Sequence, residues 1–313
     1  MSSPAGVCDV GFVLNVFKSP GWTSHDAVER VRRILDFRKV GHTGTLDPCA
    51  TGVLLCCVGR ATKLSGFLLE LTKEYEGSMI FGRRTASGDL AGEVLEDRRL
   101  PLPPLADLEA AVRDLEGEIL QVPPMVSALK HEGQRLYQLA RRGITVERAP
   151  RRVYVESFRI LETEGRRIRF RVRCARGTYV RALVEDVGAR FGVGACVDQL
   201  CRTRVGPFTA EDAIDLGGPP GAEELRRRAV PMADSLAHLP DWRVPSFWVR
   251  KLRDGHAPPW VVLELGRPPQ AGEVGRLLGS AGDLVAVGRA VAIPGLADRP
   301  WTDALGLELL RVI

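Results

Sequence analysis

The sequence predicts an α+β protein whose strands and helices are mixed up to about residue 240 and are followed by a small β-barrel. Two observations support this class. Apolar strand patterns and amphipathic helix patterns follow one another between residues 11 and 216. From residue 242 onward, short strand patterns are separated by Gly and Pro. A chain of 313 residues also predicts two domains at about 150 residues each, which we expect over residues 1–240 and 241–313.

The first predicted helix begins at Thr23 or Ser24, since either can cap it, and ends near Phe37. Its apolar positions form one stripe: Ala27, Val28, Val31, Ile34 and Leu35. A loop is expected over residues 41–48 and a buried strand over 50–58. A short helix over 62–71 and a strand over 75–81 follow.

The middle of the chain continues with a proline-rich stretch at 100–104 and predicted helices over 107–115 and 135–142. Strands over 152–161 and 167–174 flank a turn at Gly165, and Thr178 is expected to cap a helix that ends at Arg190. Glycines and prolines at 217–221 interrupt the chain before a short helix over 222–230. We place the domain boundary near Pro240, which leaves about seventy residues for the barrel.

The composition is that of a soluble globular protein, with 45% hydrophobic and 27% charged residues. No apolar run approaches the roughly 18 residues of a membrane span, and residues 1–15 lack the pattern of a signal peptide. We therefore expect a cytoplasmic protein without membrane contact. Seven cysteines without a C-x-x-C pair and five scattered histidines predict neither disulfides nor a metal site.

Positive charge is concentrated between residues 141 and 181, where thirteen Arg, four Glu and no Lys give a net charge of +9. Arg167, Arg169, Arg171 and Arg173 alternate with apolar residues, so a strand places them on one face. Such a face suits a polyanion, and guanidinium groups favour RNA because they bind phosphate and stack on bases. The alternative is a solvated strand face without a role in binding.

The segment of residues 41–48 combines two Gly, two Thr, His42 and Asp47 between a predicted helix and a buried strand. Glycine permits the sharp backbone angles that direct side chains into a cleft, and Pro48 keeps Asp47 extended. Asp47 is thus a candidate reactive carboxylate. Two other interpretations are an Asx turn before proline and an aspartyl-phosphate site, although neither a P-loop lysine nor a carboxylate pair for magnesium accompanies it.

Extended to residue 54, this segment closely resembles the catalytic signature of TruB-type tRNA pseudouridine synthases. Four more segments resemble motifs of that family in the right order: 18–24, 73–75, 123–130 and 176–181. The resemblance covers about residues 11–216, and a weaker one relates the residues beyond Pro240 to the PUA-type RNA-binding barrel. Ser19 stands where many members have a second proline. Ala86 stands where the segment 85–92 usually has an aspartate, whereas Asp89 matches.

The resemblance implies the pseudouridine-synthase fold, a mixed, mainly antiparallel sheet with flanking helices, with a PUA-like barrel after it. The implied reaction isomerises the T-loop uridine of tRNA, position 55 in tRNA nomenclature, to pseudouridine. This intramolecular transfer breaks the N-glycosidic bond and rejoins the base through C5, so it implies no cofactor and no metal. The uridine must be flipped out, which costs a few kcal/mol. The implied partner is the T-arm of tRNA, bound by a monomer.

The resemblance assigns three catalytic residues. Asp47 is implied as the carboxylate that starts the reaction, either by covalent attack or as a base at the ribose. Arg181 is implied to pair with Asp47, although a phosphate contact is the alternative for an arginine in this basic block. Tyr75 is implied to stack on the target uracil and to help remove the C5 proton.

Four further residues are implied to bind the substrate together with Tyr75. Tyr179 and Leu200 match positions that wall the pocket. His42 is implied to fill the stack that the flipped base vacates, and Lys18 to support either the active-site loops or the RNA. Without the motifs, both pocket residues would be interpreted simply as buried, and His42 as a turn residue.

Three alternatives to a stand-alone tRNA synthase remain at this point. The basic block and the predicted barrel also suit an RNA-binding chaperone that acts on tRNA folding. A synthase acting on another RNA is the second, and a relative that depends on a guide RNA is the third. Product formation separates the first from an enzyme, whereas salt dependence does not, because both would bind phosphates.

Overall fold

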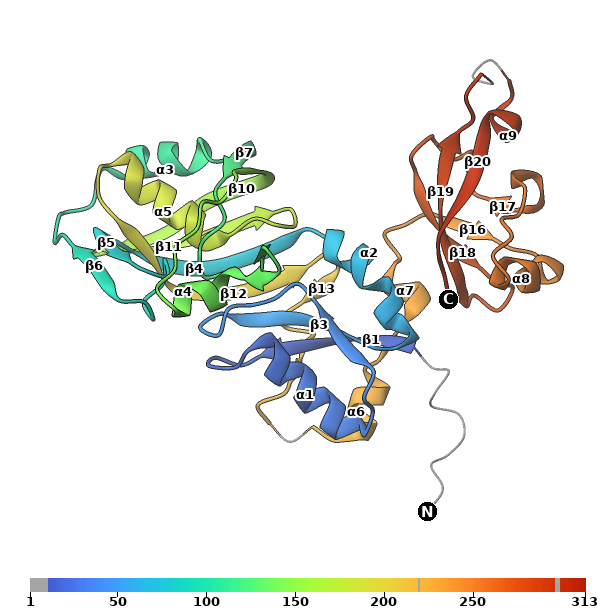
Figure 1. Ribbon diagram of the computed structural model, residues 1–313, viewed down its shortest axis with the longest axis horizontal. Coiled ribbons are helices and arrows are strands. Elements are labelled where there is room, and N and C mark those ends of the chain that lie inside the picture. Colours follow the sequence, from blue (N-terminus) through green and yellow to red (C-terminus); the bar gives the residue numbers. More distant parts are fainter. Residues whose placement is uncertain (1–10, 219, 296–298) are drawn as a thin grey trace.

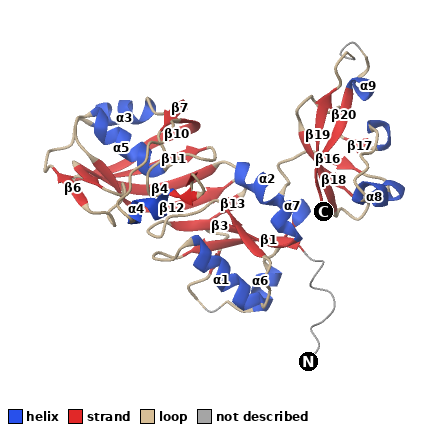
Figure 2. Cartoon of the chain, in the orientation of Figure 1, coloured by secondary structure: helices blue, strands red, loops and turns tan. Residues whose placement is uncertain are grey.

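The computed structural model describes residues 11–218, 220–295 and 299–313. Figure 1 shows a large strand-rich body, with helices on either side of it, and a smaller group of strands that contains the C-terminus. Figure 2 shows the same arrangement by element type. The predicted α+β class is confirmed. In the described part of the chain, no helix is long and apolar enough to cross a membrane.

The helices and strands that were predicted in the N-terminal part begin close to the expected positions, and β1, which was not predicted, precedes them. They are β1 Gly11–Lys18, α1 Ser24–Leu35, β2 Val40–Thr43, β3 Thr51–Gly59, the 3₁₀ helix η1 Arg60–Leu64, α2 Ser65–Glu70 and β4 Lys73–Phe81. Thr23 caps α1, and its hydroxyl accepts a hydrogen bond from the Asp26 amide. One prediction is wrong: residues 41–43 belong to strand β2, because they pair with β3 and His42 lies opposite Cys56.

The middle elements include the predicted hairpin. They are β5 Arg83–Thr85, β6 Val94–Asp97, α3 Leu105–Arg113, β7 Gly117–Gln121, β8 Lys130–His131, β9 Gln134–Arg135, α4 Leu136–Arg141, β10 Arg151–Glu164, β11 Arg167–Cys174 and α5 Val180–Arg190. The turn at Gly165 connects β10 to β11. The predicted cap by Thr178 is wrong. Its hydroxyl donates to the Ala175 carbonyl, and Tyr179 occupies the cap position without a side-chain bond.

Four strands and two short helices complete this part of the chain. They are β12 Ala195–Val205, β13 Phe208–Thr209, β14 Ile214–Asp215, α6 Ala222–Arg227, β15 Val230–Pro231 and α7 Met232–Ser235. The main strand order is β14-β1-β3-β12-β4-β11-β10-β7. Only the pairs β1–β14 and β3–β12 of this path are parallel, so the sheet is mixed and mainly antiparallel. β3, β12 and β4 stand side by side at its centre.

The C-terminal elements form a second sheet that begins one residue after Pro240. They are β16 Asp241–Arg243, α8 Ser246–Arg253, η2 Trp260–Val262, β17 Glu264–Leu265, β18 Val274–Leu278, β19 Leu284–Ala292, α9 Trp301–Ala304 and β20 Leu305–Val312. The strand order is β17-β16-β18-β19-β20. The prediction for this part of the chain was a small β-barrel, and among the described residues no hydrogen-bonded pairing between the edge strands β17 and β20 is seen.

The second sheet packs against η1 and α2. Leu64 and Leu68 share one core cluster with Leu278, Val287 and Ile313 from the C-terminal sheet. Lys63 Nζ also donates to the Val312 carbonyl at 3.0 Å. Cutting the chain after Pro240 would expose this apolar surface to water, so point substitutions are a cleaner way to examine what the C-terminal residues do.

Candidate active site

The segment that carries Asp47 connects β2 to β3 and is anchored on α1. The Ser24 hydroxyl accepts a hydrogen bond from the Leu46 amide at 2.8 Å and donates one to the Leu46 carbonyl at 3.2 Å. Both residues are buried, and Leu46 lies in the apolar core beneath β4 and β11. The residue before Asp47 is therefore fixed through both its backbone and its side chain.

Lys18, the last residue of β1, fixes the backbone of Pro48, the residue after Asp47. Its ammonium group is fully buried and donates to the carbonyl oxygens of Ser19 at 3.1 Å, Trp22 at 2.7 Å and Pro48 at 3.3 Å. An ammonium group has three N–H donors, and each has an acceptor here. Lys18 thereby joins the loop that contains Ser19 and Trp22 to the loop that carries Asp47 and Pro48.

Burial lowers the pKa of Lys18 from its ordinary 10.5 to about 8. Between these two values the unfolded chain binds more protons than the folded one, so this group makes the free energy of unfolding rise with pH. Lys18→Met removes this contribution. Between pH 8 and 10 we therefore expect the Tm of the wild-type protein to rise relative to that of the variant, as measured by thermal denaturation. A difference in Tm that stays constant over this range would contradict the inferred titration.

Asp47 faces Arg181, the second residue of α5. Arg181 Nε lies 2.8 Å from Asp47 Oδ2, and the Arg181 side chain is only 4% exposed against 35% for Asp47. The other two nitrogens of Arg181 donate to the carbonyl oxygens of Ser87 at 2.6 Å and Val126 at 2.7 Å. Within the described ranges, the Asp47 carboxylate accepts no bond from a backbone amide, so it does not form the Asx turn considered above.

Tyr75 on β4 faces a buried guanidinium group that the sequence analysis did not single out. Arg202 on β12 is 1% exposed, and its Cζ lies 6.0 Å from the centre of the Tyr75 ring. Its Nε donates to the Val53 carbonyl at 2.7 Å and its Nη2 to the Gly44 carbonyl at 3.0 Å. Burial raises the pKa of the Tyr75 hydroxyl, and the positive charge of Arg202 opposes that shift.

Gly52 allows Arg202 to reach this position. β12 runs parallel to β3 with Arg202 opposite Gly52, and Gly52 has a φ of +106°. A Cβ atom at residue 52 would lie 2.2 Å from the Arg202 carbonyl oxygen. Only glycine therefore permits the close approach of the two strands that brings Arg202 under the loop of Asp47.

Tyr179 and Leu200 lie around the same centre. Gln121 accepts a hydrogen bond from the Tyr179 amide at 2.8 Å and donates one to its carbonyl at 3.1 Å, which fixes the backbone of this residue. Burial raises the pKa of Tyr179, and the negative charge of Asp47 raises it further. Leu200 is 9% exposed, and Tyr75 packs against the core cluster that contains it. The structure thus brings Lys18, Arg181, Tyr75 and Tyr179 together around Asp47.

His42 lies on β2, and its ring is half-buried. Burial lowers the pKa of His42, and the charge of Arg202 lowers it further, so the ring is neutral at pH 7. Its Nδ1 is buried without a hydrogen-bond partner among the described residues. A neutral aromatic ring of this kind can stack on a base.

Asp89 lies close to Asp47 but has partners of its own. Its carboxylate accepts hydrogen bonds from the Ser87 hydroxyl at 2.5 Å, the Ala91 amide at 3.1 Å and the Cys49 thiol at 3.5 Å. Ala86, the departure from the family pattern, uses its amide to donate to the Glu93 carbonyl at 2.9 Å.

In the described part of the chain, no group of three or more His, Cys, Asp or Glu could hold a metal ion. Cys8 lies outside it.

The predicted polyanion-binding face of β11 is occupied by ion pairs within the chain. Arg167, Arg169, Arg171 and Arg173 pair with carboxylates at 2.9, 2.8, 2.5 and 2.9 Å. The partners are Asp198, Glu162, Glu76 and Glu156. The structure therefore favours the alternative, a solvated strand face whose charge is compensated.

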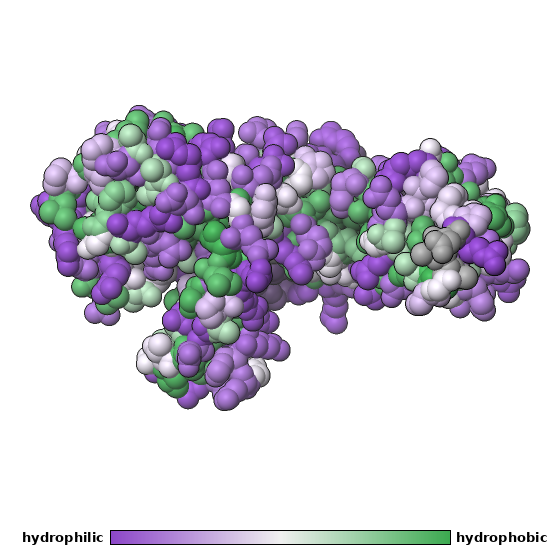
Figure 3. Space-filling model, turned by 90° about the horizontal axis from the view of Figure 1, so that it is seen from above, coloured by the Kyte–Doolittle hydropathy of each residue, from purple (hydrophilic) through white to green (hydrophobic). Residues whose placement is uncertain are grey.

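Basic residues without carboxylate partners lie instead in the segment 122–151. Within the described ranges, no carboxylate oxygen lies within 4 Å of Lys130, Arg135, Arg142, Arg148 or Arg151, although hydrogen bonds hold Arg135, Arg142 and Arg148. Val122 and Ile144 are exposed among them. Figure 3 shows one face of the molecule, on which hydrophilic residues dominate and apolar ones form small areas.

Replacing Arg202 tests whether its guanidinium group supports the arrangement of Tyr75 and the loop of Asp47. We expect Arg202→Met to lower the turnover of bound substrate by about tenfold or more, since it releases Gly44 and Val53 and removes the charge beside Tyr75. Arg202→Lys should restore part of the turnover. Arg204→Met, which removes an exposed arginine from the same strand, should leave turnover unchanged. Single-turnover measurement checks this, and equal turnover of the Arg202 and Arg204 variants would contradict it.

Residues 32–180 match the model described as TruB family pseudouridylate synthase (N terminal domain), and residues 181–217 match the tRNA pseudouridylate synthase B C-terminal domain. The chain is 44% identical over 245 residues to tRNA pseudouridine synthase B of Chromohalobacter salexigens, covering 78% of this chain and 80% of that protein. It is 42% identical to the protein of the same name from Stutzerimonas stutzeri, covering 90% and 92%.

Two solved structures match this chain over nearly its whole length. A Cbf5-Nop10-Gar1 complex matches with a TM-score of 0.72 at 29% identity, covering 96% of this chain and 84% of that chain. The archaeal box H/ACA sRNP Nop10-Cbf5 complex matches with a TM-score of 0.70 at 27% identity, covering 98% and 86%. These matches extend over both sheets.

Proposed function

The chain belongs to the TruB family of pseudouridylate synthases, and from this premise we propose that it converts the T-loop uridine of tRNA, position 55, to pseudouridine. The observation that carries the proposal is the Asp47–Arg181 ion pair at 2.8 Å with two tyrosines around it. Relatives that are more than 40% identical bear the name tRNA pseudouridine synthase B. The isomerisation moves one proton from C5 to N1 of the base and exchanges the N1–C1′ bond for a C5–C1′ bond, so atoms and electrons balance within the substrate.

In this proposal Asp47 starts the reaction, by attack or as a base at the ribose, and Arg181 orients it. Because Arg181 is nearly buried and also bound to two carbonyl groups, it cannot turn towards the RNA backbone without breaking these bonds. This argues against the alternative in which Arg181 contacts a phosphate. The side chain of Asp47 is the more exposed partner, as a group that meets the substrate has to be.

Tyr75 provides the stacking surface for the uracil in this mechanism. Its ring packs on the core cluster that contains Leu200, and Arg202 Cζ lies 6.0 Å from the ring centre. We assign to the Tyr75 hydroxyl a part in removing the C5 proton. Burial raises the pKa of this hydroxyl, and the charge of Arg202 offsets part of that shift. Tyr179 and Leu200 wall the pocket, and His42 replaces the flipped base in the stack.

The T-arm would lie against the segment 122–151. Its unpaired basic side chains suit phosphates, and exposed Val122 and Ile144 suit the flat surface of bases. Val126, which belongs to the same segment, accepts a hydrogen bond from Arg181, so RNA bound here lies next to Asp47. We further propose that the protein works in the cytoplasm as a monomer.

Mapping the modified position tests the proposal. A tRNA transcript is incubated with the protein, treated with a carbodiimide that marks pseudouridine, and copied by reverse transcriptase. We expect one new stop, at the T-loop uridine. A stop at other uridines only would indicate another RNA substrate, and tight tRNA binding without any stop would favour the chaperone alternative.

A further inference from the structure

Six buried side-chain atoms in the described part of the chain have no hydrogen-bond partner there. They belong to Asn15, Arg32, His42, Thr43, Ser127 and Arg148. Burial of a polar group without a partner costs free energy. A buried group of this kind beside a reaction centre is therefore a candidate for a bond to the substrate.

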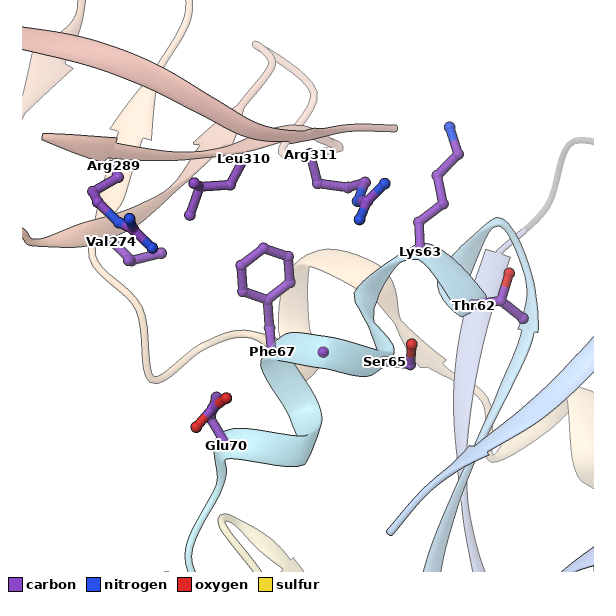
Figure 4. Close-up of a pocket in the computed structure, with 10 residues that line it drawn as sticks. Thr62, Lys63, Ser65, Phe67, Glu70, Val274, Arg289, Leu310 and Arg311 are labelled. Atoms are coloured by element: carbon purple, nitrogen blue, oxygen red, sulfur yellow. The ribbon is translucent and has the colours of Figure 1, made fainter. Parts of the chain in front are cut away.

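The groove between α2 and the C-terminal sheet is of a different kind. It has a volume of about 630 Å³, and Figure 4 shows Phe67 from α2 facing Leu310 and Val274 across it. None of its described lining residues contributes one of the six atoms. Its charged lining residues are all exposed to solvent: Lys63, Glu70, Arg289 and Arg311.

Ser127 is the residue among the six that lies beside the group holding Asp47. The Val126 carbonyl, one residue earlier, accepts the hydrogen bond from Arg181 at 2.7 Å. The Ser127 amide donates to the Met125 carbonyl at 3.0 Å, and the Ser127 carbonyl accepts from the Tyr137 amide at 3.0 Å. The residue is 6% exposed. Its backbone is thus fixed, and its hydroxyl is the one polar group left without a bond.

The Ser127 hydroxyl lies next to the hydroxyl of Tyr179. Burial raises the pKa of Tyr179, and the Ser127 hydroxyl opposes that shift, which a neutral group does only at close range. The charge of Asp47 acts on the same phenol. Because Gln121 fixes the backbone of Tyr179, both hydroxyls extend from rigid segments towards the reaction centre.

The proposed reaction creates an acceptor for such a hydroxyl. When the N1–C1′ bond breaks, its electron pair stays on the base, and the negative charge is shared by the two carbonyl oxygens O2 and O4. The N3 atom of uracil carries a hydrogen, so these two oxygens are the acceptors of the base. A fixed donor that faces an oxygen on which charge develops lowers the barrier of the step.

We propose that the Ser127 hydroxyl donates a hydrogen bond to a carbonyl oxygen of the target uracil and stabilises the base as it leaves the ribose. Ser127 itself forms and breaks no covalent bond. The basic side chains of segment 122–151 contact phosphates from the surface in the proposed function, whereas Ser127 is buried beside a wall of the base pocket. This inference rests on that proposed function.

Two variants of Ser127 and one control test the inference. Ser127→Ala removes the donor, and Ser127→Cys keeps nearly the same shape with a weak donor. Ser235→Ala is the matched control, because Ser235 is also fully buried but its hydroxyl donates to the Met232 carbonyl at 2.8 Å. It lies on α7, outside the proposed active site.

Single-turnover kinetics, filter binding of tRNA and thermal denaturation are measured for each protein. We expect Ser127→Ala to slow the turnover of bound tRNA by about 100-fold, the scale for one donor to a developing negative charge. Its tRNA affinity should be unchanged. Its Tm should not fall below that of the wild-type protein, since a buried hydroxyl without a partner is removed. Ser127→Cys should be intermediate in rate, and Ser235→Ala should turn over like the wild-type protein.

A second comparison separates direct contact with uracil from an effect through Tyr179. In a Tyr179→Phe background, Ser127→Ala should slow turnover by the same factor as in the wild-type background, because the two hydroxyls then act independently. If Ser127→Ala has no effect in that background, the hydroxyl acts only through Tyr179, and the inference is wrong.

Two further results would overturn the inference. One is a wild-type rate for Ser127→Ala, and the other is a loss of rate that is equal in the Ala and Cys variants and accompanied by a lower Tm in both. Absence of pseudouridine formation by the wild-type protein is a separate outcome, which would count against the proposed function itself.

Discussion

Asp47→Asn is expected to reduce pseudouridine formation by about 10⁴-fold or more, the scale seen when a nucleophile or general base is removed from an active site. Asparagine has nearly the same shape but neither attacks carbon nor accepts a proton from the ribose. The backbone around residue 47 is held by Ser24 and Lys18, so the loop should keep its conformation. Single-turnover kinetics with saturating enzyme, combined with filter binding of tRNA, measures both quantities.

Binding of tRNA by the Asp47 variant should remain that of the wild-type protein, because the surface that we propose for the T-arm is the segment 122–151. Asp36→Asn serves as the control: this residue is exposed and has a φ of 48°, a conformation that asparagine also tolerates. It should leave turnover unchanged. Turnover of the Asp47 variant within tenfold of wild type would remove Asp47 from the reaction.

Arg181→Lys should lower turnover by about 100-fold or more, with tRNA affinity retained. The guanidinium reaches Asp47, Ser87 and Val126 at once, at 2.6 to 2.8 Å. An ammonium group on a flexible stem cannot reproduce this planar set of donors. Asp47 would then lose its fixed orientation, and displacement of a reacting group by about 1 Å costs on the order of 100-fold in rate. Rapid-quench measurement of product on preformed complexes gives the rate directly.

The same change at Arg190 provides the control for helix α5. Arg190 lies at the end of that helix and pairs with Asp114 at 2.5 Å on the surface, so Arg190→Lys should keep full activity. If Arg181→Lys weakens tRNA binding and leaves the turnover of bound tRNA intact, Arg181 contacts phosphate and does not orient Asp47.

Local patterns predicted those parts of the fold that depend on neighbours in the sequence. The apolar stripe of α1 and its cap at Thr23 are set within about four residues. The hairpin at Gly165 follows from alternation on both sides of a glycine turn. By contrast, residues 41–43 form a strand only because β3 is available for pairing. The neighbouring sequence does not contain that information.

The site was predictable where a motif names the residue and not where tertiary contacts create it. Asp47 and Arg181 lie in motifs that resemble the family, and the structure pairs them. Arg202 reaches its position beside Tyr75 only through the approach of β12 to Gly52, 150 residues earlier in the chain. The alternating arginines of β11 show the reverse case. Their charge was visible in the sequence, but carboxylates from β4, β10 and β12 compensate it.

The central claim is that this chain isomerises one uridine of tRNA. The most direct measurement is release of tritium from a tRNA transcript labelled at C5 of uridine, compared with a transcript in which the T-loop uridine is replaced by cytidine. We predict the release of one tritium per wild-type tRNA and none from the cytidine variant. No release from the wild-type transcript, or equal release from both, would contradict the claim.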